Sequence, residues 1–392
     1  MTETTAFETR FGFKRSDVTL ANWRLSPFNQ WSFQNLRELV PSMGIASAAA
    51  PETLPSLGSL VDRSFDLNGM EIGMERFLQA AETDMLLVLK DGKPVAGWQA
   101  PHADANRPHI VFSISKSITA LVAGILNDQG VLDLEAPLLS LLPEAEGSAY
   151  GKATLRQLLD MRLSLDFEEA YTDPSGGFAR YRRATLWNPQ GGEEPETLRG
   201  FLMSIKQGEG EHGGAFRYRS PNSDLLGIVV ERATGRRFAE LAAERLWQPM
   251  GATGEAYVTV DAEGSPRTAG GVLMTAHDLA RVGELMRQSG AVGGRQVVSE
   301  AFVRDTLENG DKEAWKDGDF AELFAEGSYR NKWYASGERS GAFAAIGIHG
   351  QWLYVDPSRG VTIVKMSSQA DPTNDRVDQL NLFFFRELAA MV

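Results

Sequence analysis

Ser113 and Lys116 are the two residues of this chain whose types and spacing best suit covalent catalysis. Residues i and i+3 share one face of a helix, so a hydroxyl and an amine at this spacing can meet. A serine hydroxyl is a weak nucleophile until a neighbouring base takes its proton. A lysine can be that base when burial or a nearby cation lowers its pKa to roughly 7–8. The pair therefore predicts a nucleophile, Ser113, with Lys116 as its base.

The residues around this pair favour catalysis over a helix cap with a solvated lysine. It is the only Ser-x-x-Lys in the chain, and the apolar stretch 110–112 leads directly into it. Apolar residues then recur at helical spacing as far as Gly130. They are Ile118, Leu121, Val122, Ile125 and Leu126. We expect this helix to bury the motif.

Tyr218 belongs to a second candidate element, Phe216-Arg-Tyr-Arg-Ser-Pro-Asn222, directly before an expected helix. A tyrosine on such a loop can relay a proton between a serine and a leaving group. The alternative is that Tyr218 only anchors the start of the helix.

The third candidate element is the glycine-punctuated stretch 341–350. Glycine in a strand lets a substrate approach the backbone, where an N–H group can supply half of an oxyanion hole. An ordinary edge strand is the alternative. For His349, within this stretch, a structural hydrogen-bonding role is favoured over a catalytic one.

The elements that must position these residues alternate between strands at both ends of the chain and helices in the middle. Two apolar runs around Asp91-Gly92 predict a hairpin, because this pair accepts the positive φ of a tight turn. Further strands are expected at 342–348, 351–355 and 361–366, before a closing helix over 377–391.

This order predicts an α/β (α+β) fold, with an antiparallel sheet flanked by helices and an inserted all-helical domain. We expect residues 1–110 and 268–392 to form the α/β domain. Residues 111–267 would form the helical domain, with the active site between the two. Trp23, Trp31 and Phe33 are expected to anchor the irregular first 60 or so residues. A capping box is expected to open a helix at Thr275.

The composition is that of a globular protein and excludes several classes of function. The net charge of −13 argues against nucleic acid or an anionic membrane as partner. The absence of cysteine excludes disulfides, thiolate catalysis and cysteine-ligated metals. The five histidines lack metal-ligand spacing. We expect no metal or cofactor, a small-molecule substrate as the only partner, and a monomer or homodimer. Without a signal peptide or membrane span, a cytoplasmic protein is expected.

Three further patterns point away from other chemistries. Gly208-Glu-Gly-Glu-His-Gly213 follows an expected helix rather than a strand, so a plain loop is favoured over a nucleotide site. No Gly-x-Ser-x-Gly is present, which disfavours an α/β-hydrolase triad. Glu168 and Glu169 are interpreted as a solvated turn, because adjacent residues cannot flank a glycosidic bond.

The three elements, in this order and spacing, resemble the superfamily of serine β-lactamases and D-alanyl-D-alanine peptidases, which includes related esterases. The resemblance runs from about residue 80 to the C-terminus and includes residues 130–137, 154–159 and 269–275. Within the superfamily the chain is most similar to the nylon-oligomer hydrolases, which act on 6-aminohexanoate dimers. That closer likeness is carried by residues 113–117, 166–174, 327–329 and 346–351.

The resemblance implies a catalytic role for each matching residue. Ser113 would be acylated, Lys116 would act as its base, and Tyr218 would shuttle the proton. The backbone N–H groups of Ser113 and Ile348 would form the oxyanion hole.

Five further residues are implied in binding or support. Tyr171 matches a tyrosine that hydrogen-bonds the substrate amide as it leaves, and Ser220 falls where the family places a polar partner of the lysine. Asn222, Gly347 and His349 belong to the matching elements and are expected to support the site.

Departures from the family pattern narrow the expected substrate. Ala345-Ile346-Gly347 stands where many relatives carry Lys-Thr-Gly or His-Thr-Gly, whose cation and hydroxyl hold a substrate carboxylate. We therefore expect poor β-lactamase and peptidase activity. Residues 180–183 form a basic loop where the nylon-oligomer hydrolases use an acidic group to attract a substrate amine.

These features predict a serine hydrolase that forms an acyl-enzyme with small linear amides or esters, with hydrolysis of the 6-aminohexanoate-dimer type favoured. One alternative is a carboxylesterase acting on short acyl esters. The other is a non-catalytic relative that only binds a ligand.

Overall fold

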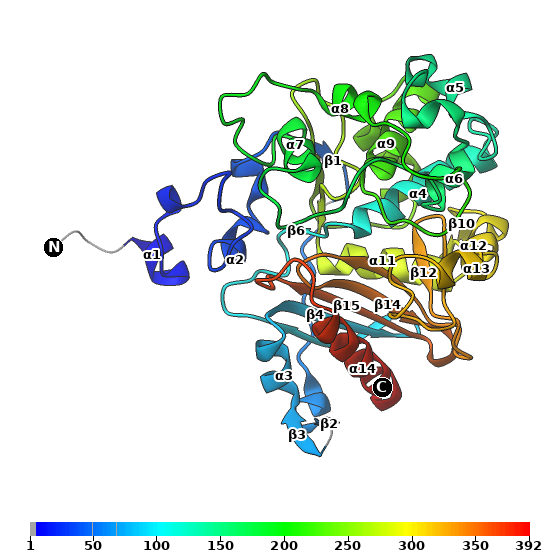
Figure 1. Cartoon of the computed structure of the whole chain (residues 1–392). Coiled ribbons are helices and arrows are strands. Elements are labelled where there is room, and N and C mark those ends of the chain that lie inside the picture. The colour runs from blue at the N-terminus through cyan, green and yellow to red at the C-terminus, as the bar shows by residue number, and fades with distance from the viewer. Residues whose placement is uncertain (1–4, 49, 68) are drawn as a thin grey trace.

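The computed structural model describes residues 5–48, 50–67 and 69–392. Its centre is a seven-stranded antiparallel sheet below a helical region (Figure 1). In spatial order the strands are β11 (Ser328–Arg330), β12 (Trp333–Ala335), β13 (Phe343–Gly347), β14 (Gln351–Asp356), β15 (Val361–Ser367), β4 (Thr83–Lys90) and β5 (Lys93–Gln99). The early strands β4 and β5 thus pair beside the late strand β15, which confirms a sheet built from distant parts of the chain.

Strand β4 shows why this sheet is covered on both faces. Its side chains alternate, so Met85 and Leu87 enter one apolar cluster and Leu86 and Val88 enter another. Helix α11 (Ala276–Arg287) covers the first face, and helix α14 (Asp375–Met391) covers the second. A strand buried on both faces reads as a continuous apolar run, as β4 does.

The expected hairpin joins β4 to β5. Asp91 has φ 50° and Gly92 has φ 77°, as a tight primed turn requires. The strands expected in the last third of the chain are also confirmed.

The middle of the chain is mainly helical and lies above the sheet in Figure 1. Its helices are α4 (Ile114–Asp128), α5 (Leu138–Leu141), α6 (Leu155–Leu159), α7 (Gly177–Ala184), α8 (Leu198–Ser204), α9 (Pro221–Thr234) and α10 (Phe238–Ala242), the last continuing into a π-helical turn at Ala243–Trp247. The exact domain limits at 110/111 and 267/268 stay a prediction.

A second antiparallel sheet joins the N-terminal segment to the helical region. Its order is β1 (Ser42–Ile45), β7 (Ala256–Thr259), β8 (Val272–Met274) and β6 (His109–Ile110). The remaining α-helices are α1 (Ala6–Phe11), α2 (Asn29–Ser32), α3 (Met74–Ala80), α12 (Glu300–Glu308) and α13 (Lys312–Lys316). Two small antiparallel strand pairs complete the fold: β2 (Ser64–Leu67) pairs with β3 (Met70–Gly73), and β9 (Ala291–Val292) pairs with β10 (Arg295–Gln296). Trp23, Trp31 and Phe33 are buried, so the predicted anchors are confirmed.

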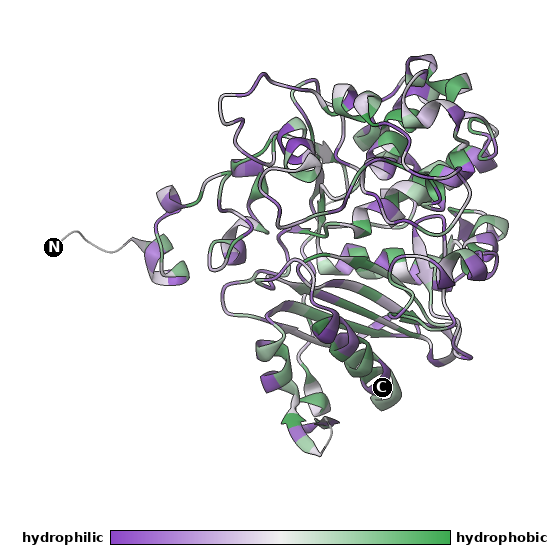
Figure 2. Cartoon of the chain, in the orientation of Figure 1, coloured by the Kyte–Doolittle hydropathy of each residue, from purple (hydrophilic) through white to green (hydrophobic). Residues whose placement is uncertain are grey.

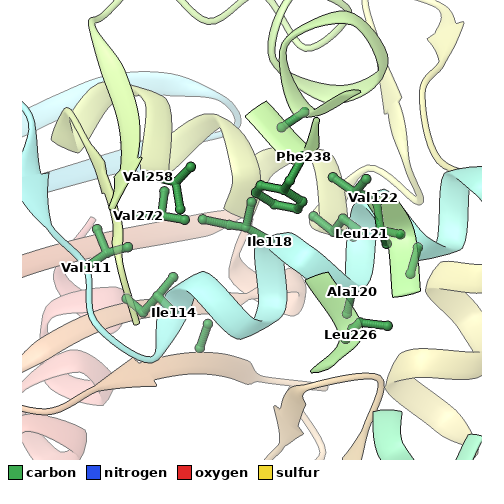
Figure 3. Close-up of a cluster of buried hydrophobic side chains, with 14 of the residues drawn as sticks. Val111, Ile114, Ile118, Ala120, Leu121, Val122, Leu226, Phe238, Val258 and Val272 are labelled. Carbon is green, nitrogen blue, oxygen red and sulfur yellow. The ribbon is translucent and has the colours of Figure 1, made fainter. Parts of the chain in front are cut away.

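The interior is apolar around helix α4. Ile114, Ile118 and Leu121 point into a cluster with residues from α9, α10, β7 and β8 (Figure 3). The hydropathy colouring shows apolar residues along the sheet and inner helices, and polar residues along the outer loops (Figure 2). Among the described residues, none of the helices is both long enough and apolar enough to cross a bilayer.

Two local expectations need correction. The box at Thr275 is only half formed: the Thr275 hydroxyl accepts from the Asp278 N–H at 3.3 Å, but the Asp278 carboxylate turns to the N–H groups of Thr253 and Gly254. The helix expected after Asn222 already begins at Pro221, because proline suits the first helical position.

Candidate active site

Ser113 lies at the sharp turn from strand β6 into helix α4. The residue before it, Phe112, has φ 42°, a left-handed conformation that costs a non-glycine residue about 1–3 kcal/mol. Aromatic neighbours hold this turn. The rings of Trp23 and Phe112 are stacked with their centroids 6.4 Å apart, and the ring of Phe33 meets that of Phe112 edge-on, with a centroid distance of 5.1 Å. The N-terminal anchor therefore supports the turn that presents Ser113.

Lys116 sits one turn into α4 and faces Ser113. Its Nζ lies 2.7 Å from Ser113 Oγ and 2.6 Å from the carbonyl oxygen of Ala269. The Ser113 side chain makes no helix-capping hydrogen bond, so its hydroxyl is directed to the lysine. The geometry thus brings together the predicted nucleophile and base.

The lysine is buried, at 1% exposure, and this controls its charge. Burial lowers the pKa of Lys116 to about 7, helped by the Arg267 guanidinium and opposed by the carboxylates of Glu169 and Asp224. A neutral amine can donate to the Ala269 carbonyl while it accepts the Ser113 proton. A substantial fraction of Lys116 is therefore a free base near neutral pH.

Tyr218 lies beside the same two residues. Its ring centroid is 4.9 Å from Lys116 Nζ, and its backbone N–H donates to Asp319 at 2.9 Å. Burial raises the pKa of Tyr218 well above its usual value, and the Glu169 carboxylate adds to this, while the Ser113 side chain opposes it. The phenol is therefore protonated at neutral pH and available as a proton donor.

The end of strand β13 packs against the start of α4. A Cβ on Gly347 would lie 2.5 Å from the Val111 carbonyl oxygen and 3.1 Å from the Ser113 backbone nitrogen. Only glycine allows this approach, which places the next residue, Ile348, in the wall of the pocket that holds Ser113. The two predicted oxyanion-hole residues are thus neighbours.

A buried glutamine holds the turn after Ile348. Gln351 Nε2 donates to the carbonyl oxygens of His349 at 2.9 Å and Ser367 at 2.6 Å, and its Oε1 accepts from the Ser367 N–H at 3.1 Å. His349 adds a 2.7 Å bond between Nδ1 and the Gln369 carbonyl oxygen. Burial lowers the pKa of His349 to about 3, so the ring is neutral at physiological pH.

The interpretation of Glu169 as part of a solvated turn is wrong, whereas Glu168 is exposed. Glu169 accepts from the Ser220 N–H at 2.9 Å, from the Ser220 hydroxyl, and from the Tyr171 hydroxyl at 3.1 Å. Among the described residues, Ser220 therefore hydrogen-bonds to Glu169 and not to Lys116, the partner that was expected. In an extended segment, residues i and i+2 share a face. The two-residue spacing of Glu169 and Tyr171 was therefore the signal in the sequence that could have predicted their contact.

The basic segment at 180–183 also differs from expectation. It lies in helix α7, where Arg180 pairs with Glu196 and Arg183 with Glu193. Arg182 donates to the Tyr171 carbonyl oxygen at 2.8 Å. These charges are therefore paired or used to position Tyr171.

The pocket beside Ser113 is mostly aromatic and aliphatic. Tyr171, Tyr218, Gly347 and Ile348 line it as expected. Asn222 does not line it: its side chain is buried and its Nδ2 contacts Met161 Sδ at 3.5 Å. Ile346 and Gly350, which also line the pocket, belong to the candidate stretch 341–350. Sequence reasoning missed the other lining residues, which are Phe320, Leu323, Tyr334, Gln369, Pro372, Thr373 and Asp378.

Within the described ranges, no three His, Asp or Glu side chains are grouped so as to hold a metal ion. The stretch 208–213 is a loop after α8, as expected.

Comparison with known proteins identifies the family of this chain. The family model described as Beta-lactamase matches residues 74–383, which include every residue of the pocket. The chain belongs to the β-lactamase family. It is an enzyme of the serine-hydrolase type found in this family, and the recognised resemblance is confirmed.

Three relatives cover between 80% and 96% of this β-lactamase-family chain. It is 36% identical over 364 residues to 6-aminohexanoate-dimer hydrolase of Paenarthrobacter ureafaciens, spanning 92% of this chain and 91% of that protein. A solved structure from Bacillus anthracis, provisionally assigned as a 6-aminohexanoate-dimer hydrolase, superposes with a TM-score of 0.85 at 26% identity, covering 96% and 97% of the two chains. A class C β-lactamase from Rhodobacter sphaeroides shares the fold, with a TM-score of 0.56 at 16% identity, 80% of this chain and 96% of that chain.

Proposed function

We propose that this protein hydrolyses small linear amides and esters through an acyl-enzyme on Ser113, with amides of the 6-aminohexanoate-dimer type as preferred substrates. The supporting observation is the 2.7 Å approach of a buried Lys116, with a pKa of about 7, to the Ser113 hydroxyl. The name and coverage of the Paenarthrobacter relative support the choice of substrate.

In the proposed acylation, Ser113 Oγ attacks the substrate carbonyl carbon and its proton passes to neutral Lys116. The developing oxyanion accepts hydrogen bonds from the backbone N–H groups of Ser113 and Ile348. The carbon–nitrogen or carbon–oxygen bond then breaks, and Tyr218 gives its proton to the leaving group. The ammonium of Lys116 returns a proton to Tyr218.

Deacylation repeats these roles with water. The attacking water gives one proton to neutral Lys116, with Tyr218 as the relay. The tetrahedral intermediate then expels Ser113 Oγ, which takes that proton back from the Lys116 ammonium. The acid product leaves and the free enzyme is restored.

Tyr171 is the proposed partner of the departing amine. Its hydroxyl is held by Glu169 and its backbone by Arg182, at the wall of the pocket that holds Ser113. An amine is a poorer leaving group than an alkoxide, so Tyr171 should matter more for amides.

Ester hydrolysis by the same residues is the second candidate, because the apolar lining suits short acyl chains. A protein that only binds a ligand would have no use for a neutral lysine against a serine hydroxyl.

A fluorophosphonate probe tests the proposal. Mass spectrometry should find one adduct, on Ser113, and p-nitrophenyl acetate should be turned over. Ser113→Ala should lose both the adduct and the turnover. Absence of adduct and turnover in the unmodified protein would favour the ligand-binding alternative.

A further inference from the structure

Asp378 lines the same pocket as Ser113 but comes from a different part of the fold. It lies in the first turn of helix α14, which covers the far face of the large sheet. Its side chain is partly buried. Its carboxylate makes no hydrogen bond or ion pair with any other residue in 5–48, 50–67 and 69–392. It is therefore free to meet a ligand.

Among the described residues that line this pocket, no other one carries a charge. The wall consists of tyrosines, apolar side chains, backbone at glycine, and the neutral polar residues Ser113, Gln369 and Thr373. A single carboxylate in largely apolar surroundings is poorly screened by water, so it attracts a cation and repels an anion more strongly than on the surface.

Lys365, whose positive charge acts on Asp378, forms no ion pair with it. Lys365 on β15 is fully buried and donates to Ser367 Oγ at 2.6 Å and to the Ala81 carbonyl oxygen at 3.3 Å. Burial raises the pKa of Asp378 to about 6, with Lys365 opposing and Asp375 adding to the rise. The carboxylate is therefore mainly ionised at neutral pH.

We propose that Asp378 determines substrate specificity by binding a cationic end of the substrate, such as the ammonium of an ω-amino acyl chain. This inference rests on the proposed function of the same pocket. The aliphatic part of the substrate would lie on the apolar wall formed by Phe320, Leu323 and Ile346. Substrates with a carboxylate at that end would be repelled.

Calorimetry tests the binding separately from catalysis. Hexylammonium, hexanol and hexanoate are matched in chain length and differ in charge. The unmodified protein should bind hexylammonium about tenfold or more tightly than hexanol, as expected for a charge-assisted hydrogen bond, and hexanoate most weakly. Asp378→Asn and Asp378→Ser should both lose this order.

Asp375→Asn is the matched control, because Asp375 lies one turn earlier on the same helix and is exposed. Asp375→Asn should still bind hexylammonium most tightly, hexanol less tightly and hexanoate most weakly. Equal binding of hexylammonium and hexanol by the unmodified protein, or an unchanged preference in both Asp378 variants, would overturn the proposal.

Kinetics extend the test to turnover. The ratio of kcat/KM for p-nitrophenyl 6-aminohexanoate to that for p-nitrophenyl hexanoate should fall about tenfold in Asp378→Asn and stay constant in Asp375→Asn. A lack of turnover of both esters would count against the proposed function alone, because calorimetry still reports on Asp378. Turnover with an unchanged ratio would count against the role of Asp378 alone.

Discussion

At the scale of single residues, the activity of Ser113 depends on the protonation of Lys116. The lysine is buried beside a hydroxyl, a tyrosine ring and a backbone carbonyl oxygen. Its protonated form has no lone pair and cannot take the Ser113 proton, so pH and nearby charges should set the rate.

We predict that kcat/KM for a neutral ester rises with pH through about 7, as Lys116 loses its proton. Lys116→Ala should lower kcat/KM by about 10²–10⁴-fold and abolish this rise. Stopped-flow measurement with p-nitrophenyl acetate would show both effects. An unchanged rise in Lys116→Ala would mean that another group is the base.

Glu169 should set the midpoint of that rise. Its negative charge stabilises the ammonium and so raises the pKa of Lys116. Glu169→Gln removes the charge, and the rise should move to lower pH. Glu168→Gln, at the exposed neighbour, is the control and should leave the midpoint in place. A shift to higher pH, or none, would contradict this coupling.

Tyr171 should separate amides from esters. Tyr171→Phe removes the hydroxyl that would assist an amine leaving group, so amide hydrolysis should fall at least about tenfold. Turnover of p-nitrophenyl esters should change little. Parallel kinetics with 6-aminohexanoate dimer and p-nitrophenyl acetate would measure this, and an equal loss on both would disprove the division.

At the scale of elements, the site depends on how the turn between β13 and β14 is held against α4. Gly347 allows the backbone approach, and the Gln351 side chain ties the turn to β15. The Ile348 N–H belongs to this turn, so its direction depends on these hydrogen bonds.

We predict that Gln351→Met lowers kcat more than it raises KM, because methionine fills a similar volume but cannot donate to His349 and Ser367. The loss should approach the roughly 10²–10³-fold effect of removing an oxyanion-hole donor. Tyr354→Phe is the control, because Tyr354 lies on the same strand, β14, and its side chain packs into the apolar cluster that includes helix α14. A rise in KM alone, or an equal loss in Tyr354→Phe, would contradict this role.

At the scale of the whole molecule, a buried ion pair connects the helical region to the segment that contacts Lys116. Asp224 on α9 pairs with Arg267 and accepts from the Tyr181 hydroxyl and from the Ala269 N–H. The Ala269 carbonyl oxygen then accepts from Lys116. Stability and catalysis are thus linked here.

We predict that Asp224→Asn destabilises the fold by about 3–5 kcal/mol, because it leaves the Arg267 charge buried without its partner. Calorimetry should show a clearly lower unfolding midpoint. Glu240→Gln, which removes an exposed pairing with Arg236, should cost no more than about 1 kcal/mol. Similar midpoints for the two variants would show that the buried pair contributes little.

The amino-acid sequence by itself determined the features that depend on local geometry. Ser113 and Lys116 face each other because a helix places i and i+3 on one face. The hairpin at Asp91-Gly92 and the burial of β4 follow from turn chemistry and from apolar composition. The sequence pattern also singled out Tyr218 and the stretch 341–350, and the resemblance to a known family then indicated Tyr171 and the backbone at Ile348.

Tertiary packing alone decided which distant residues complete the pocket. The sequence indicated a solvated turn at Glu169, whereas in the fold the start of α9 places the Ser220 N–H and hydroxyl against its carboxylate. Asp378, in the last helix, reaches the pocket because α14 folds back across the sheet beside the end of β13. Local spacing fixes neighbours along a helix or strand, whereas contacts between distant segments depend on how whole elements pack, which no short motif encodes.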